Sequence, residues 1–329
     1  MTAVYLGLDI AKDSYDAVLL RDGQDDRGRH RAFPNTTAGH QALQDWLQRQ
    51  SVAPAALHAC LEATGRYGDA LAQALYDAGY TVSVVNPARI KAYAASELQR
   101  AKTDRLDAGV IARFGRAQRP RPWTPPTPEQ RQLQALQRRL DDLQAMYRQE
   151  DNRRQAPGTP PAVQASIQTI LAALQAEIQA IRQQLAEHID HHPTLKAQRA
   201  LLCSIPGISH TTATVLLAEI GNVHAFRSAR QLAAYAGLTP RPRLSGSSVR
   251  GRTRLAKTGN ARLRKALYFP AVVAKKHNPL IRAFCQRLLA AGKTTMCVLA
   301  AAMRKLLHLA FGILRSQRPF DPNYIHETT

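Results

Sequence analysis

A proline-rich segment at residues 119–128, with the sequence RPRPWTPPTP, divides this chain of 329 residues into parts with different patterns. Proline lacks a backbone N–H and has a fixed φ angle, so neither a helix nor a sheet ladder continues through such a segment. Proline-rich stretches act as stiff spacers. Because a chain of this length favours two or three domains, we place a first domain at residues 1–125.

Before this segment, short apolar runs alternate with amphipathic segments. The apolar runs predict strands at residues 4–10, 15–20, 29–33, 56–61 and 81–85. Apolar positions three and four apart predict helices at residues 40–50, 67–78, 88–98 and 103–117. The order of three strands, helix, strand, helix, strand and helix indicates an α/β domain.

After the proline-rich segment, apolar residues follow a 3-4-3-4 spacing that is typical of a coiled-coil seam. They are Leu133, Leu136, Leu140, Leu143 and Tyr147. The sequence PGTPP at residues 157–161 breaks this helix, and a second apolar stripe follows. It comprises Ile167, Ile170, Leu174, Ile178, Ile181 and Leu185. We expect an antiparallel coiled-coil arm over residues 126–192 that packs on itself or dimerises; the alternative is an arm that only spaces two domains.

Residues 193–329 are expected to form a basic, mostly α-helical domain. Its segment LLCSIPGIS, around Gly207, has the form of a helix-hairpin-helix element. In such an element the Pro-Gly turn aims backbone N–H groups at a phosphate; an ordinary packing turn is the alternative. A loop rich in Pro, Gly and Ser follows at residues 239–251, and three helical segments are expected within residues 261–314.

Basic and acidic side chains are also distributed unevenly along the chain. The chain has a net charge of +21, but residues 1–195 hold 23 basic and 21 acidic side chains, whereas residues 196–329 hold 22 and 3. Such an excess indicates a polyanionic partner, either nucleic acid or an anionic membrane. No uninterrupted apolar run approaches about 18 residues and no signal peptide is apparent, so we expect a cytoplasmic protein without a membrane segment. The cysteines form no C-x-x-C pair, which disfavours a zinc site: Cys60, Cys203, Cys285 and Cys297.

Four carboxylates of the first domain are candidate metal ligands. Asp9 lies inside an apolar run, where an unpaired charge is costly to bury. Glu62 follows the fourth strand, and Asp104 and Asp107 are three apart on one helix and share a face. A divalent cation relieves repulsion among such acids, Mg²⁺ prefers oxygen ligands, and two Mg²⁺ ions suit phosphodiester chemistry.

Each acid also has an ordinary interpretation. Asp13 and Asp16 lie close to Asp9 and could be ordinary surface acids. Glu62 could cap the turn that follows it. Asp104 could pair with Arg100 or Arg105.

Residues 241–265 carry nine basic side chains, and no acid occurs between residues 220 and 320. Cations at this density predict phosphate binding that weakens steeply with salt; a solvated basic face is the alternative. The candidate nucleic-acid contacts, besides Gly207, are Arg241, Arg243, Arg250, Arg252, Arg254, Lys257, Arg262, Arg264 and Lys265.

The same segment contains Ser245, Gly246, Ser247 and Ser248. A serine hydroxyl is a weak nucleophile unless its surroundings activate it. Composition alone therefore favours a flexible turn. Tyr235 and Tyr268 are interpreted as core aromatics rather than as tyrosine nucleophiles.

Several motifs together resemble one family. The runs LGLDIAK (residues 6–12), LEATGRYG (61–68), VVNPARIKAYA (84–94) and KTDRLDAGVIARF (102–114) resemble the N-terminal domain of DEDD insertion-sequence transposases. That domain has the RNase H fold of Holliday-junction resolvases. The run LAAYAGLTPRPRLSGSSVRGRTRLAKTGNARLRKALY (232–268) is similar to the C-terminal domain of the same family.

The resemblance implies a function. Asp9, Glu62, Asp104 and Asp107 would bind Mg²⁺, and Ser245 would attack the scissile phosphate to form a covalent phosphoserine; Ser247 and Ser248 stay alternatives. A structured guide RNA would pair with donor and target DNA. A homodimer would assemble into a tetramer in which the serine loop of one subunit completes the acidic site of another. The alternatives are an RNase H-fold nuclease or resolvase that uses water, and a non-catalytic nucleic-acid scaffold.

Overall fold

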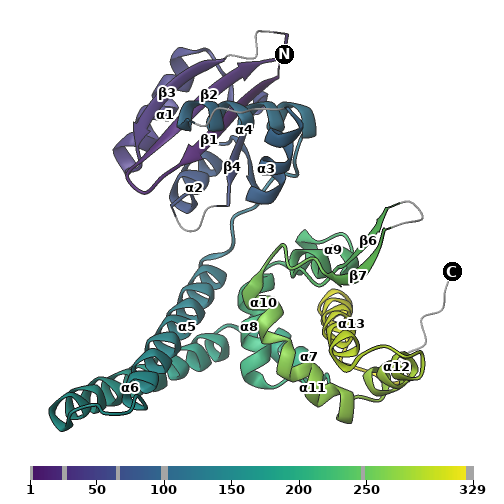
Figure 1. Ribbon diagram of the computed structural model, residues 1–329. Coiled ribbons are helices and arrows are strands. Elements are labelled where there is room, and N and C mark those ends of the chain that lie inside the picture. The colour runs from purple at the N-terminus through teal and green to yellow at the C-terminus, as the bar shows by residue number, and fades with distance from the viewer. Residues whose placement is uncertain (1–2, 24–27, 64–66, 98–102, 246–248, 324–329) are drawn as a thin grey trace. The chain divides into compact units, whose positions relative to one another are not determined.

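The computed structural model describes residues 3–23, 28–63, 67–97, 103–245 and 249–323, without the side chains between residues 242 and 252. The chain divides into two compact units, Met1–Pro125 and Pro126–Thr329 (Figure 1). Each unit is described by itself.

The N-terminal unit is built on a five-stranded sheet of order β3-β2-β1-β4-β5. The first three strands pair antiparallel, whereas β4 pairs parallel with both β1 and β5. This mixed sheet with its helices is compatible with an RNase H-like domain, and it has the order of elements that the sequence predicts. The strands are β1 (Val4–Ile10), β2 (Ser14–Arg21), β3 (Arg29–Pro34), β4 (Leu57–Glu62) and β5 (Thr81–Val85). The helices are α1 (Thr37–Arg49), α2 (Asp69–Asp77), α3 (Pro87–Ser96) and α4 (Asp104–Gln118).

Side chains of the central strand β1 alternate between two buried faces of the sheet. Leu6 and Leu8 belong to the cluster that includes Leu43 of α1 and Leu71 of α2. Tyr5 belongs to a separate cluster with residues of α4. Alternating side chains of a strand point to opposite faces, so α4 covers the face opposite to α1 and α2.

In the C-terminal unit, α5 (Pro128–Arg154) and α6 (Pro161–His191) form the expected helical hairpin (Figure 1). Leu133, Leu140 and Leu143 are buried as the 3-4-3-4 spacing predicts. The second stripe is wrong at one position: Ile170 is 44% exposed, and its neighbour Leu171 is 8% exposed instead. The stripe takes two successive steps of four residues, from Ile170 to Leu174 and from Leu174 to Ile178, and the exchange falls where this departure from the 3-4 alternation begins.

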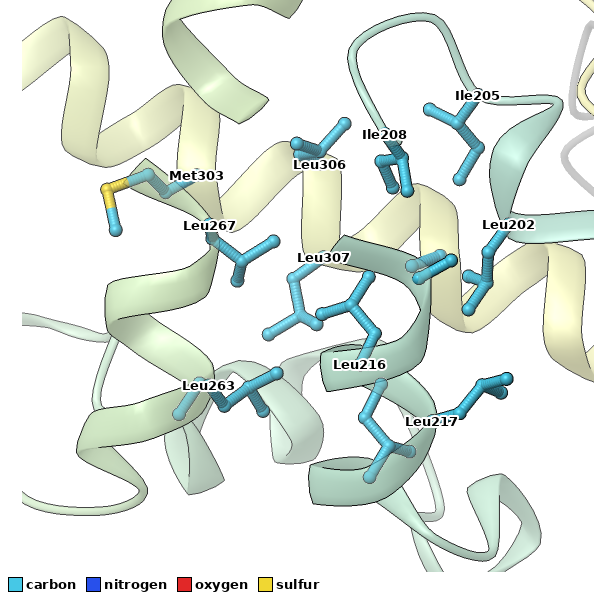
Figure 2. Packing of buried hydrophobic residues seen from close by; sticks show 14 of the residues in the cluster. Leu202, Ile205, Ile208, Leu216, Leu217, Leu263, Leu267, Met303, Leu306 and Leu307 are labelled. Atoms are coloured by element: carbon cyan, nitrogen blue, oxygen red, sulfur yellow. The ribbon is translucent and has the colours of Figure 1, made fainter. Parts of the chain in front are cut away.

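The rest of this unit is mostly helical, as predicted, and shares one hydrophobic cluster with the arm. Figure 2 shows Leu216, Leu263 and Leu307, which come from three different helices and belong to this one cluster. In the described residues after 260 there are four helices rather than three, because Leu267 and Asn278 end α10 and α11. The helices are α7 (Pro193–Cys203), α8 (His210–Ile220), α9 (Ala229–Tyr235), α10 (Ala261–Ala266), α11 (Tyr268–His277), α12 (Pro279–Ala290) and α13 (Thr295–Ser316).

The loop expected at residues 239–251 is instead a two-stranded hairpin. Strand β6 (Pro240–Ser245) pairs antiparallel with β7 (Val249–Leu255). Arginine alternates with Pro, Gly, Thr and Leu here, so the apolar side chains that mark a half-buried strand are missing.

Helix α13 is long and apolar enough to cross a membrane, judged by length and composition, with a mean hydropathy of 1.7 over 18 residues. No uninterrupted apolar run of this length is expected from the sequence. Helix α13 still meets the criterion, because its scattered cations interrupt the apolar run without lowering the mean hydropathy of the window enough. Half of the window is buried inside the unit, and Leu306 and Leu307 are fully buried. A core helix passes the same test.

Candidate active site

Asp9 and Glu62 lie at the carboxyl ends of two adjacent parallel strands. The register pairs Gly7 with Cys60 and Leu8 with Leu61. One further step along both strands sets Asp9 beside Glu62, at the interstrand spacing of about 4.8 Å. Side chains alternate along a strand, so Asp9 shares a face with Gly7, and Glu62 shares a face with Cys60.

Helix α4 covers that face. A Cβ atom on Gly7 would lie 2.1 Å from the carbonyl oxygen of Ala108 and 2.3 Å from the amide nitrogen of Ala112. Further along the helix, a Cβ atom on Gly115 would lie 2.8 Å from the Cys60 Sγ atom and 3.9 Å from Tyr5. The helix therefore runs against the direction of β1. Its first turn lies toward the strand end that carries Asp9.

That first turn contains Asp104 and Asp107. Thr103 begins the helix, and its side chain accepts a hydrogen bond from the Leu106 amide at 3.3 Å. Acids in a first turn also interact favourably with the helix dipole, so these two aspartates stabilise the helix in any case. Asp104 is exposed and Asp107 half-buried. Asp9 and Glu62 thus share one face of the sheet, and the first turn of α4 lies toward the same end of that face.

The donor chemistry of this edge fits Mg²⁺. In the described part of the chain, no group of three or more His, Cys, Asp or Glu side chains stands ready to enclose a metal ion. Mg²⁺ does not demand such a cage, because it keeps several waters and binds through one or two carboxylates together with substrate phosphates. The four predicted ligands are all carboxylates, which agrees with that preference.

Asp16 is an acid at this edge whose position the sequence interpretation missed. It pairs directly with Asp9 across the antiparallel strands, so both lie on the α4 face. Its carboxylate is bonded to the His30 ring on β3 and is mostly buried, with 17% exposed. It is not an ordinary surface acid, and locating the turn after Ile10 would have revealed the pairing. The alternative partner of Asp104, Arg100, lies outside the described residues.

Ser245 ends strand β6, and its Cα atom pairs with that of Val249 across the hairpin. Ser247 and Ser248 lie outside the described residues. The side chains of Arg243, Arg250 and Arg252 fall in the undescribed range.

The lack of acids between residues 220 and 320 does not leave every cation of the basic segment unpaired. Arg262 forms an ion pair with Asp141 of α5 at 3.5 Å. Arg264 is half-buried and donates to two backbone carbonyls. The remaining described cations of the segment are exposed: Arg241, Arg254, Lys257 and Lys265.

Gly207 has a packing role in the turn between α7 and α8. Its φ is +107°, and a Cβ atom there would lie 2.8 Å from Ala274 and 2.9 Å from the Pro270 carbonyl oxygen, both of α11. Ser209 caps α8 by accepting a hydrogen bond from the Thr212 amide. The glycine is therefore explained by close packing, and phosphate contact at this turn stays a prediction.

The prediction that Tyr235 and Tyr268 are core aromatics is wrong, because Tyr235 is 42% and Tyr268 37% exposed. The Tyr235 hydroxyl accepts a hydrogen bond from Asn260 Nδ2 at 3.2 Å. Burial of its hydroxyl end and the nearby Glu219 carboxylate raise the pKa of Tyr235, against the opposing effect of Asn260. A raised pKa makes this phenol a weak nucleophile.

Two family models match this chain. Residues 6–156 match the family model of a DEDD transposase of the IS110 type, and residues 199–286 match the transposase IS116/IS110/IS902 family.

Three relatives illustrate the likeness. The pilin gene-inverting protein of Moraxella bovis is 34% identical over 328 residues, 99% of this chain and 100% of that protein. An uncharacterised 43.6 kDa protein of insertion element IS110 from Streptomyces coelicolor is 32% identical over 48% of this chain and 38% of its own length. The transposase for insertion sequence element IS1111A of Coxiella burnetii is 38% identical over 22% of this chain and 20% of its own length. The end-to-end match and both family models show that this chain belongs to the IS110 family of transposases, which are DNA recombinases.

Proposed function

We propose that this transposase cuts and rejoins DNA through a covalent bond between Ser245 and the scissile phosphate, at a site whose carboxylates hold Mg²⁺. The observation that supports the carboxylate half is the register that sets Asp9 beside Glu62 under the first turn of α4. The support for the serine half is family membership together with the basic hairpin that carries Ser245.

The carboxylates would act by position and charge. Asp9 is fixed by the strands on both sides of β1, and Asp107 is fixed by the capped first turn of α4. Rigid elements hold such ligands more accurately than loops do. Bound Mg²⁺ supplies charge stabilisation to a phosphoryl group in transfer.

Ser245 would exchange one phosphate ester for another. Its Oγ atom bonds to phosphorus and gives up its proton, while the bond from phosphorus to the leaving sugar oxygen breaks and that oxygen gains a proton. Attack by a sugar hydroxyl of the incoming strand reverses these changes and restores the serine. The number of phosphodiester bonds is unchanged, so rejoining needs no external energy source.

The partners follow from the family. We propose that a structured guide RNA pairs with donor and target DNA, that homodimers assemble into tetramers, and that the serine hairpin of one subunit completes the acidic site of another. The exposed cations of residues 241–265 would meet the backbones of these nucleic acids. The protein would work in the cytoplasm of a bacterium or archaeon.

The relative from Moraxella bovis is named for inverting a pilin gene. Inversion requires cutting and rejoining at both ends of a segment without loss of DNA. A mechanism that conserves phosphodiester bonds suits such an outcome, and we propose the same conservative exchange for this chain.

A strand-exchange assay with purified protein, guide RNA, labelled DNA and Mg²⁺ tests the proposal. Ser245→Ala should abolish exchange, and Ser247→Ala and Ser248→Ala are the matched controls. Full exchange by Ser245→Ala would contradict the serine mechanism. Cleavage without rejoining would favour a nuclease that uses water, and no cleavage by the wild type with any divalent cation would favour a scaffold. Exchange by the wild type without RNA would contradict guidance by RNA.

A further inference from the structure

The hairpin that carries Ser245 leaves the helical body between α9 and α10, and its two legs are joined at the base. The Ala256 amide donates to the Thr239 carbonyl at 2.9 Å, and the Lys257 amide donates to the Gly237 carbonyl at 3.2 Å. These bonds continue the β6–β7 ladder down to the helices. They join the legs to each other but do not fix the hairpin to the body.

Arg264, on the exit helix α10, makes that further connection. Its Nη1 atom donates to the carbonyl of Ala236, before the hairpin, at 3.0 Å. The same atom donates to the carbonyl of Lys257, after the hairpin, at 3.1 Å. One guanidinium nitrogen therefore binds both legs, and both of its hydrogens are used.

The backbone around this contact is shaped to admit the guanidinium. Gly237 has φ of +68°, and a Cβ atom there would lie 2.5 Å from Arg264 Nη1. Gly259 has φ of +132°, and a Cβ atom would lie 2.2 Å from the Tyr235 carbonyl oxygen. Both glycines are required by close approach as well as by conformation.

Asn260 anchors the same turn to two helices. Its backbone N–H donates to the Tyr235 carbonyl, and its side-chain Nδ2 donates to Glu219 Oε2, each at 2.6 Å. Its Oδ1 accepts from the Leu263 amide and so begins α10. Glu219 is the only acid between residues 196 and 320, and it serves here as an anchor. The fully buried Leu263 and Leu267 hold α10 in the core, so Arg264 projects from a fixed element.

We propose that Arg264 is a positioning residue that fixes the base of the hairpin and thereby the location of Ser245, rather than a nucleic-acid contact as the charge pattern predicted. The proposal rests on the proposed function, in which Ser245 is the nucleophile. Six residues of β6 span about 20 Å, so a tilt of about 10° at the base displaces the tip by roughly 3.5 Å. A displacement of about 1 Å can cost about a hundredfold in rate.

The test compares Arg264→Ala and Arg264→Lys with the wild type in three measurements: backbone hydrogen exchange, the salt dependence of DNA binding, and single-turnover cleavage at saturating DNA. Arg264→Ala should speed exchange of the β7 amides at least tenfold while the amides of α13 keep wild-type rates. The slope of log affinity against log salt should stay unchanged, and cleavage should fall at least tenfold. Arg264→Lys keeps the positive charge but has fewer well-placed hydrogen-bond donors. Its cleavage rate should therefore lie between those of the wild type and Arg264→Ala.

Lys265→Ala provides the comparison for the salt slope, because this neighbouring cation is exposed. Removing one phosphate contact makes this negative slope less steep by about 0.9. If Arg264→Ala lowers the slope by that amount with unchanged β7 exchange, Arg264 is a phosphate contact and the proposal is overturned. If hydrogen exchange of the α13 amides also rises in Arg264→Ala, Arg264 only supports the fold, and this result overturns the proposal as well. Full activity of Ser245→Ala would instead refute the proposed function while leaving the hydrogen-exchange result valid.

Discussion

The two units hold the residues that we propose for the chemistry in opposite ways. Asp9 lies in the central strand of a five-stranded sheet, paired on both sides and covered by α4. Ser245 ends one strand of a two-stranded ribbon that is fastened to its unit at the base. Metal ligands need a fixed geometry before substrate arrives. A nucleophile that bonds to DNA and later releases it has to reach a strand, so a projecting ribbon with a rigid base suits it.

The largest expected effect comes from the N-terminal unit. Asp9→Asn should lower the cleavage rate by on the order of a thousandfold, because charge stabilisation through a bound metal is worth several kcal/mol. DNA binding should be retained, since the contacts are expected in the basic unit. Single-turnover cleavage with Mg²⁺ measures the change, and Asp13→Asn, an exposed acid beyond β1, is the matched control. Equal rates for Asp9→Asn and the control would remove the acids from the mechanism.

The second prediction concerns the contact that sets α4 on the sheet. Gly7→Ala should destabilise the N-terminal unit by about 1–3 kcal/mol, because its Cβ atom meets the backbone of α4. Cleavage should fall as well, since the first turn of α4 is displaced. Urea unfolding followed by circular dichroism measures the stability. Gly312→Ala, in an open stretch of α13, should instead stabilise by about 0.5–1 kcal/mol. Wild-type stability of Gly7→Ala would show that α4 does not lie over Gly7.

The smallest effect distinguishes two cations of the basic unit. Arg254 is exposed, whereas Arg262 is paired with Asp141. Arg254→Ala should lower the steepness of the fall of log affinity with log salt by about 0.9. Arg262→Ala should lower it less, because its partner already offsets part of the charge. Filter binding between 50 and 200 mM salt, roughly the range in which such slopes are steep, measures both. Equal losses would show that the ion pair opens when DNA binds.

The sequence predicts much more of the N-terminal unit than of the C-terminal one, for a physical reason. The strands around Asp9 are apolar because they are buried on both faces, so their pattern is visible. The order of strands then brings Asp9 and Glu62 together. The pairing of Asp9 with Asp16 depends on the position of one turn, which the pattern does not specify.

The basic hairpin gives no comparable pattern, because arginines occupy most of its alternate positions. Charge density alone also cannot separate Arg264 from its neighbours. Arg264 differs by facing two carbonyls beside Gly237, and those contacts exist only after α9 and α10 have packed. Local composition therefore predicts the kind of partner, whereas tertiary packing decides which cations meet it.

The most direct measurement is the mapping of a protein–DNA bond after reaction of the wild type with cleavable DNA, guide RNA and Mg²⁺. Denaturing electrophoresis isolates the adduct, and peptide mass spectrometry locates the modified residue. We predict a nucleotide on Ser245, and no adduct with Asp9→Asn or with the metal chelated. An adduct on another residue, or an undiminished adduct with Asp9→Asn, would contradict a site divided between an acidic sheet and a serine hairpin.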